Sequence, residues 1–204
     1  MRHIHKHVGL EKAIIGAGGF AREIKAVLGL SSIKFFVDEK HANPTAGIYG
    51  FSEFDPEIYE VVVAVGNPRD RFNIIQSLPK NTKYFTFVDS SVQIHGNDVE
   101  IGEGSIICAG SIITTNIKLG KHTHLNLLTT IGHDCVIDDY FTTAPGAKVS
   151  GNCNIEKYVY VGTNSSIREK LNICSDVTIG MNAAVVKHVT IPGIYVGVPA
   201  KKLK

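Results

Sequence analysis

Residues 101–119 read IGEGSIICAGSIITTNIKL, and this stretch opens a series in which nearly every sixth residue is a branched aliphatic. Thr143 alone breaks the series. A period of six fits neither the helical repeat near 3.6 residues nor the simple alternation of a half-buried strand. The members are Ile101, Ile107, Ile113, Leu119, Leu125, Ile131, Ile137, Thr143, Val149, Ile155, Val161, Ile167, Ile173, Ile179, Val185 and Ile191.

A second position, four residues after each aliphatic, is mostly small. Hexapeptide repeats of this kind are typical of a parallel β-helix, in which the aliphatic side chain points into a prism and the small one fits beside it. Three units close one coil of about eighteen residues, so the repeat predicts roughly five coils. The small residues are Ser105, Ser111, Thr123, Thr129, Cys135, Ala147, Cys153, Ser165 and Ala183.

The N-terminal part reads differently, as a strand, a glycine turn and a helix. The predicted strand runs from Lys12 to Ile15, Gly16, Gly18 and Gly19 form the turn, and the helix reaches about Leu28. The glycines match the G-x-G-x-x-A pattern of a nucleotide-binding turn. Only one mononucleotide-binding half fits before the repeat begins, which favours a mononucleotide or nucleotide-sugar ligand over NAD.

Two further predicted strands end at candidate ligand contacts. Residues 33–37 lead to Asp38, and residues 61–65 lead to Gly66 and Asn67. Because parallel strands present their carboxyl ends at one edge of a sheet, these residues are expected near the glycine turn. Asp38 falls close to the position of the acid that binds ribose in dinucleotide folds.

These patterns divide the chain into a tail (1–11), a half-size Rossmann-like nucleotide-binding α/β domain (12–90) and a β-helix domain with a C-terminal loop (91–204). Residues 85–88 are expected to form a strand and residues 89–98 to link the domains. The tail carries His3, His5 and His7, which we interpret as a solvated extension rather than a chelating strip.

Composition narrows the class of protein. The chain has 204 residues, 44% of them hydrophobic, and a formal net charge of +2, which argues against nucleic acid as an obligate partner. No apolar run reaches the length of a membrane span, and the N-terminus lacks a secretory pattern. Cys108, Cys135, Cys153 and Cys174 lack metal-binding spacing and are expected to be reduced thiols. The cytoplasm is therefore the expected compartment.

The candidate for chemistry within the repeat is His133. It stands two residues after an inward aliphatic, where its side chain can project outwards, and an imidazole is a suitable general base near neutral pH. Asp134 follows it and can hold the imidazole if the backbone bends between them. Because His122 and His124 do not reproduce a standard ligand spacing, no metal site is predicted.

The glycine turn, the repeat and the segment IGHDCVI at 131–137 together resemble the hexapeptide-repeat sugar acyltransferases. The resemblance covers Lys12 to Lys202 and is strongest to bacillosamine-type UDP-4-amino-sugar N-acetyltransferases and sialic acid O-acetyltransferases. It implies a left-handed β-helix, a homotrimer, acetyl-CoA in the groove between neighbouring β-helices, and a nucleotide sugar reaching in from the N-terminal domain.

The resemblance also implies roles for individual residues. His133 is the general base, Asp134 its acid, and the Gly151 amide the oxyanion donor. Asn126 lies near the sugar, and Gly16, Gly18, Gly19, Asp38, Gly66 and Asn67 correspond to the nucleotide-sugar site. Gly151, Gly162, Thr163, Gly180 and Pro199 correspond to the acetyl-CoA path. Two departures concern the sugar: Thr142 replaces a second active-site histidine found in some members, and residues 17–20 lack the family's Ser and His.

The expected activity is direct transfer of acetyl from acetyl-CoA to the 4-amino group of a nucleotide-linked, UDP-type, 4-amino-4,6-dideoxy sugar. O-acetylation of sialic acid or another sugar hydroxyl is a second hypothesis. A nucleotide-sugar-binding scaffold without catalysis is a third, and a nicotinamide-dependent oxidoreductase a fourth that the single half-site disfavours. The glycan pathway stays open.

Overall fold

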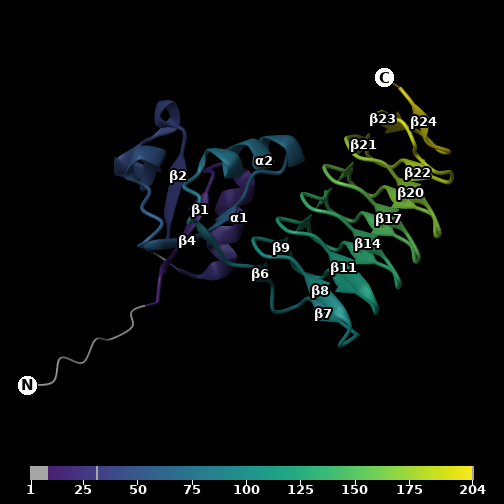
Figure 1. The fold of residues 1–204 in the computed structure, drawn as a ribbon, viewed down its shortest axis with the longest axis horizontal. Coiled ribbons are helices and arrows are strands. Elements are labelled where there is room, and N and C mark those ends of the chain that lie inside the picture. The colour runs from purple at the N-terminus through teal and green to yellow at the C-terminus, as the bar shows by residue number, and fades with distance from the viewer. Residues whose placement is uncertain (1–8, 31, 204) are drawn as a thin grey trace, which may run out of the picture.

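The computed structural model describes residues 9–30 and 32–203. An α/β domain packs beside a β-helix whose coils stack one after another toward the C-terminus (Figure 1). His3, His5 and His7 lie outside the described residues. Neither of the two α-helices formed by these residues is long and apolar enough to span a bilayer.

The N-terminal domain is a five-stranded parallel sheet in the order β3-β2-β1-β4-β5. Its central strand β1 ends at Gly16, whose φ of +102° and closeness to the Ala64 carbonyl exclude most other side chains. The sheet contains two strands, β3 and β5, that the sequence analysis did not predict. The elements are β1 Glu11–Ile15, α1 Gly19–Leu28, β2 Lys34–Val37, β3 Ile48–Gly50, β4 Tyr59–Val63, α2 Pro68–Ser77 and β5 Lys83–Tyr84, with 3-10 turns at Glu39–His41, Pro44–Ala46 and Phe51–Glu53.

The β-helix is a three-sided prism of short parallel strands, as the repeat predicts. The first face holds β6 Phe87–Val88, β9 Ile106–Ile107, β12 His124–Leu125, β15 Thr142–Thr143, β18 Tyr160–Val161, β21 Val177–Ile179, β23 Gly193–Val196 and β24 Lys201–Lys202. The second face holds β7 Gln93–Ile94, β10 Ile112–Ile113, β13 Thr130–Ile131, β16 Lys148–Val149, β19 Ser166–Ile167 and β22 Ala184–Val185. The third holds β8 Val99–Ile101, β11 Ile117–Leu119, β14 Val136–Ile137, β17 Asn154–Ile155 and β20 Asn172–Ile173.

The corners of the prism share one backbone conformation. From Gly104 to Asn182, the residue three places after each inward aliphatic has a positive φ between 51° and 72°. Asparagine, aspartate and glycine tolerate this left-handed region best. The residues are Gly104, Gly110, Asn116, His122, Leu128, Asp134, Tyr140, Gly146, Asn152, Tyr158, Asn164, Lys170, Asp176 and Asn182.

The β-helix begins earlier and ends earlier than the aliphatic series suggests. β6 pairs with β9 and β7 pairs with β10, so residues 89–98, predicted as a link, belong to the first coil. At the other end Ile191 is 56% exposed and lies beyond the last inward aliphatic, Val185. The prediction that Ile191 points into the prism is wrong, because the chain leaves the coil and β24 turns back antiparallel on β23.

A buried arginine on α2 joins the N-terminal domain to the first face. The Arg71 guanidinium is fully buried and donates to the carbonyl oxygens of His122 (3.0 Å) and Tyr140 (3.1 Å) and to the Thr142 hydroxyl (2.8 Å). It also donates to the Val65 carbonyl (2.7 Å) of its own domain. Burial lowers the pKa of Arg71 to about 9, which still leaves it charged at neutral pH.

We predict that Arg71→Ala lowers the free energy of unfolding by about 3–5 kcal/mol, because it leaves several buried carbonyl groups without a donor. Urea unfolding measures this change. Arg69→Ala is the control: its half-exposed ion pair with Asp176 contributes at most about 1 kcal/mol. Equal effects of the two substitutions would contradict the role given to Arg71.

Candidate active site

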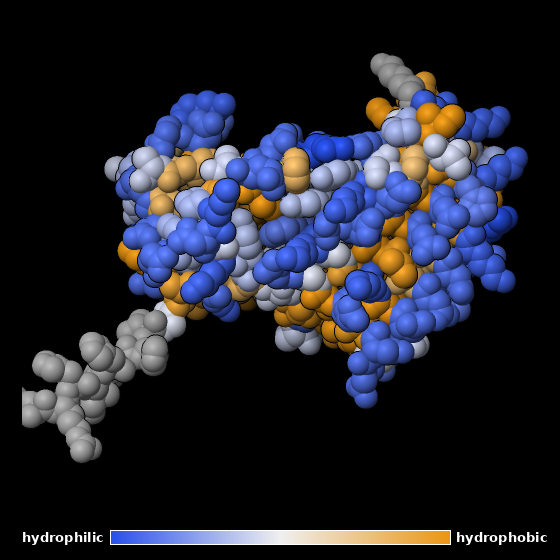
Figure 2. Space-filling view, in the orientation of Figure 1, coloured by the Kyte–Doolittle hydropathy of each residue, from blue (hydrophilic) through white to orange (hydrophobic). Residues whose placement is uncertain are grey.

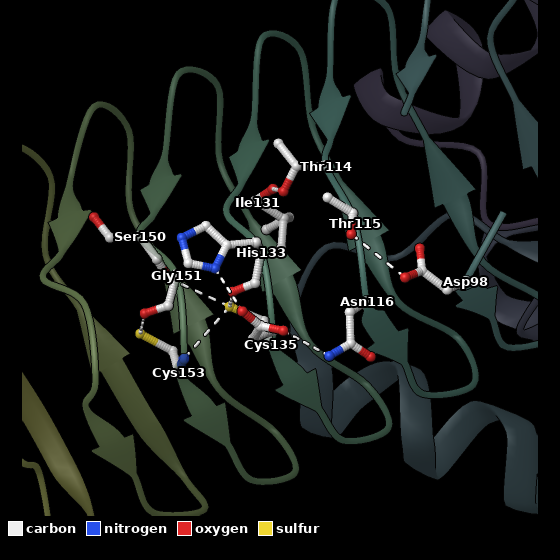
Figure 3. A network of polar contacts seen from close by, with 11 residues as sticks. Asp98, Thr114, Thr115, Asn116, Ile131, His133, Cys135, Ser150, Gly151 and Cys153 are labelled. Atoms are coloured by element: carbon white, nitrogen blue, oxygen red, sulfur yellow. Dashed lines mark hydrogen bonds and ion pairs between the residues drawn. The ribbon is translucent and has the colours of Figure 1, made fainter. Parts of the chain in front are cut away.

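His133 and Asp134 form a hydrogen-bonded pair at the corner between the second and third faces. The imidazole Nδ1 lies 2.6 Å from the Asp134 Oδ2 (Figure 3). The bend that neighbouring side chains need in order to meet is supplied by Asp134, whose φ is +59°. With Nδ1 engaged by the carboxylate, the other ring nitrogen, Nε2, is left to interact with a ligand.

Asn116, one coil earlier, holds the second oxygen of the same carboxylate. Its Nδ2 donates to the Asp134 Oδ1 at 2.6 Å. Hydrogen bonds from His133 and then from Asn116 lower the pKa of Asp134, so the carboxylate stays ionised near neutral pH. The arrangement Asn116, Asp134, His133 fixes both the orientation of the imidazole and the charge beside it.

Gly151, one coil later, lies directly under the imidazole. A Cβ at this position would come within 2.8 Å of the His133 Cε1 and Nε2, so any larger residue would displace the ring. The Gly151 N–H has no hydrogen-bond partner within the described part of the chain. A backbone donor beside an imidazole nitrogen is an arrangement that can stabilise a developing oxyanion.

Cys135 lies near this group but is engaged in the wall of the prism. Its thiol donates to the Ser150 carbonyl at 3.3 Å, and its hydrogen bond with Cys153, followed by burial, raises its pKa. A thiol that stays protonated is a poor nucleophile. The described residues hold no group of three or more His, Cys, Asp or Glu side chains placed to bind a metal ion.

A separate cavity of about 860 Å³ opens at the carboxyl edge of the N-terminal sheet. Gly16, Gly18 and Asp38 line it, as the sequence predicts, together with Lys40 and His41. Gly19 is not among the lining residues and begins α1. The cavity combines a helix N-terminus, two cationic or titratable side chains and one acid, which suits a phosphorylated, ribose-containing ligand.

Gly66 and Asn126, predicted to contact the sugar, line a smaller pocket of about 210 Å³ between the N-terminal domain and the first face. Thr163 lines it too. Asn67 lies in the adjoining pocket, but its Oδ1 accepts hydrogen bonds from the Arg69 and Asp70 amides and caps α2. The Asn67 side chain therefore has only its amide nitrogen left for a ligand.

Packing within the chain already accounts for some of the other positions noted in the sequence analysis. A Cβ on Gly162 would lie 2.7 Å from the Ile179 carbonyl oxygen, so close coil packing already requires glycine there. A Cβ on Gly180 would lie 2.8 Å from a side-chain methyl group of Val196, which can shift. Pro199 follows a cis peptide bond in the exposed C-terminal loop. Thr142 is buried and accepts the Arg71 hydrogen bond, so it belongs to the domain interface.

A single chain does not bring the N-terminal cavity, the His133–Asp134 pair and Asn126 to one place. Phe20 and Arg71 show that the N-terminal domain packs on the first face, whereas His133 stands at the corner opposite that face. Asn126 and Thr163 lie at a different corner, between the first and second faces. Within one chain, the cavity of the N-terminal domain and His133 therefore lie at separate places.

Two residues of the site were missed by the sequence analysis. Asn116 occupies one of the left-handed corner positions, and a search for Asn, Asp and Gly at every sixth residue would have placed it eighteen residues before Asp134. Thr143, the break in the aliphatic series, is buried, and its hydroxyl accepts the Asn126 amide at 2.9 Å. The break therefore marks a residue that positions a predicted ligand contact.

The chain is similar in sequence to a known domain family and to a named enzyme. Residues 13–78 match the PglD N-terminal domain. GDP-perosamine N-acetyltransferase of Escherichia coli O157:H7 is 30% identical over 167 residues, which cover 74% of this chain and 74% of that protein.

Two solved structures share the fold over nearly the full length. WeeI from Acinetobacter baumannii AYE superposes with a TM-score of 0.86 and 32% identity, covering 96% of this chain and 100% of the other. The acetyltransferase domain of PglB from Neisseria gonorrhoeae FA1090, solved in complex with acetyl coenzyme A, gives 0.84 and 29%, with coverage of 96% and 100%.

We predict that Asn116→Gly raises the pKa of Asp134, because the carboxylate loses one of its two hydrogen bonds. Glycine tolerates the positive φ, so the corner itself is kept. Carbonyl NMR across a pH titration reports the change. Asn152→Gly, at the matching corner one coil beyond Asp134, is the control, and an equal shift in that variant would show that the Asn116 bond is not the cause.

Proposed function

This chain belongs to the hexapeptide-repeat sugar acyltransferase family, and we propose that it transfers the acetyl group of acetyl-CoA to an amino group of a nucleotide-linked sugar. The observation that carries the proposal is the placement of the hydrogen-bonded His133–Asp134 pair over the Gly151 amide. The named relative acts on a GDP-linked amino sugar. A structural relative binds acetyl coenzyme A.

In the proposed reaction His133 is the general base. With its Nδ1–H donated to Asp134, the free Nε2 takes a proton from the sugar amine as the nitrogen attacks the thioester carbonyl. The carbonyl oxygen becomes an oxyanion that the Gly151 N–H stabilises. Collapse of this intermediate forms the amide, breaks the C–S bond and returns the proton from the imidazolium to the departing CoA thiolate.

Acetyl transfer is direct in this scheme, without an acyl-enzyme. The nearest thiol to His133 in the network, that of Cys135, is hydrogen-bonded inside the wall of the prism. Its raised pKa keeps it protonated.

The N-terminal cavity supplies the nucleotide site in this proposal. Diphosphate lies at the Gly18 end of α1, where backbone N–H groups are free to bind it, and Asp38 accepts from the ribose. The sugar then extends toward Asn126 in the smaller pocket at the domain interface. Gly16, Gly19, Gly66 and Asn67 shape the path. Thr163, Gly162, Gly180 and Pro199 lie along the cofactor groove.

A homotrimer completes the site. His133 and the nucleotide cavity lie on opposite sides of one β-helix, so the sugar held by one chain is acetylated at the His133 of its neighbour. Exposed aliphatic side chains on the β-helix, Leu127, Leu128 and Val136, offer apolar surface for such an interface. Figure 2 shows apolar side chains exposed along the flank of the β-helix.

The acceptor we favour is the 4-amino group of a UDP- or GDP-linked 4-amino-4,6-dideoxy sugar. UDP is the nucleotide expected from the sequence, whereas the name of the perosamine relative favours GDP. O-acetylation of sialic acid is the competing activity. We place the enzyme in the cytoplasm, because all four cysteines are free thiols, as in a reducing compartment.

We predict that His133→Ala lowers the rate of CoA release by about 10²–10⁴-fold, the range usual for a positioned base. The assay presents acetyl-CoA with UDP-, GDP- and dTDP-linked 4-amino sugars and with free sialic acid. His95→Ala, which removes an exposed histidine bonded only to Gln93, is the control and keeps full activity.

Turnover of an amino sugar that is lost only in the His133 variant supports the proposal. Turnover of sialic acid alone would replace N-acetylation by O-acetylation. Near-normal turnover by His133→Ala would remove this residue from the mechanism, and nucleotide-sugar binding without CoA binding would favour a scaffold.

A further inference from the structure

His124 is a buried histidine whose side chain has no role in the fold described so far. It lies on β12 in the first face, paired with Ile106 on one side and Thr142 on the other. Only 1% of its surface is exposed, and neither ring nitrogen has a hydrogen-bond partner within the described residues. A buried polar group left in this state destabilises the free protein.

The imidazole of His124 is neutral. Burial lowers its pKa well below the ordinary value, and the nearby charge of Arg71 lowers it further. A contact with the Val63 backbone carbonyl acts in the opposite direction and raises that pKa, although its geometry falls short of a regular hydrogen bond. A neutral imidazole has one N–H donor and one acceptor nitrogen, and here neither makes a hydrogen bond of regular geometry.

His124 lies at the smaller pocket of the domain interface. His124 lines this pocket together with Asn126, Thr142 and Tyr160. Phe20, at the start of α1, covers one side, with its ring centroid 5.4 Å from that of His124. The pocket thus has aromatic walls that suit the apolar face of a sugar ring, and side chains that can both donate to and accept from hydroxyl groups.

The neighbouring His122 shows that a buried histidine on this coil need not serve a ligand. Its Nδ1 is also buried without a hydrogen-bond partner among the described residues. Its ring, however, is packed between Tyr84 and Tyr140, with centroid distances of 4.7 and 5.4 Å, and does not line the pocket. Packing therefore accounts for His122. It does not account for two unpartnered nitrogens at the wall of a pocket.

We propose that His124 is a specificity-determining residue that hydrogen-bonds a polar substituent of the sugar ring when the nucleotide sugar is bound. The inference deepens the proposed function and rests on it. His124 lies against Phe20 and pairs with Thr142, and all three residues line the same pocket. The contact therefore distinguishes the sugar that this chain accepts.

The test is His124→Leu, which keeps a similar shape and removes both nitrogens. Because an unpartnered polar group is removed from the core, the melting temperature of the free protein rises by roughly 2–4 °C. The dissociation constant for the UDP- or GDP-linked 4-amino sugar that wild type turns over rises about tenfold. Binding of the corresponding free nucleoside diphosphate and of acetyl-CoA does not change. Calorimetry measures the three affinities.

Two further variants separate a ligand contact from a structural role. His124→Asn, which keeps a donor and an acceptor, recovers part of the lost sugar affinity. His122→Leu leaves the sugar affinity at the wild-type value.

Unchanged sugar affinity in His124→Leu, or a loss of stability in place of the gain, would overturn the inference while wild-type turnover upholds the proposed function. If wild type turns over no sugar in the panel, the proposed function fails, and the role of His124 fails with it.

Discussion

Every sixth residue of the β-helix turns a corner through the left-handed region of backbone space, and the position of each reactive group follows from that turn. Non-glycine residues adopt this conformation at a cost of about 1–2 kcal/mol, which the stacked coils must offset. At Asp134 the turn brings a carboxylate back onto the preceding imidazole at 2.6 Å. In an extended strand, successive side chains point to opposite faces and would not meet.

Stacking of coils then builds the site as columns of residues eighteen apart. Asn116 and Asp134 occupy one column of corner residues, and His133 and Gly151 occupy the column beside it. Since each coil is held to the next by parallel hydrogen bonds, His133, Asp134 and the Gly151 amide cannot move independently. Such preorganisation favours electrostatic stabilisation of a transition state, because little reorganisation is needed at the moment of reaction.

The sequence predicts the periodic part of this protein well and the contacts between its parts poorly. The aliphatic series identified the prism, and the position of His133 within it made this residue the candidate for the base, because a repeat assigns every residue a direction. No periodicity reveals that Arg71 on a short helix is buried against carbonyl groups 51 to 70 residues away. Nor does it reveal that His124 lies under another domain. The first coil was missed because Val88 and Ile94 fall outside the six-residue register.

The central claim is that the nucleotide cavity of one chain serves the His133 of another, and mixed assemblies test it directly. Gly18→Trp fills the cavity, since a side chain there meets no protein atom within 4 Å, and His133→Ala removes the base. Each variant alone is inactive. Unfolded together at equal amounts and refolded, they recover about one quarter of wild-type turnover if sites are shared between chains of a symmetric ring. No recovery in verified mixed trimers would contradict the account and place both halves of the site within one chain.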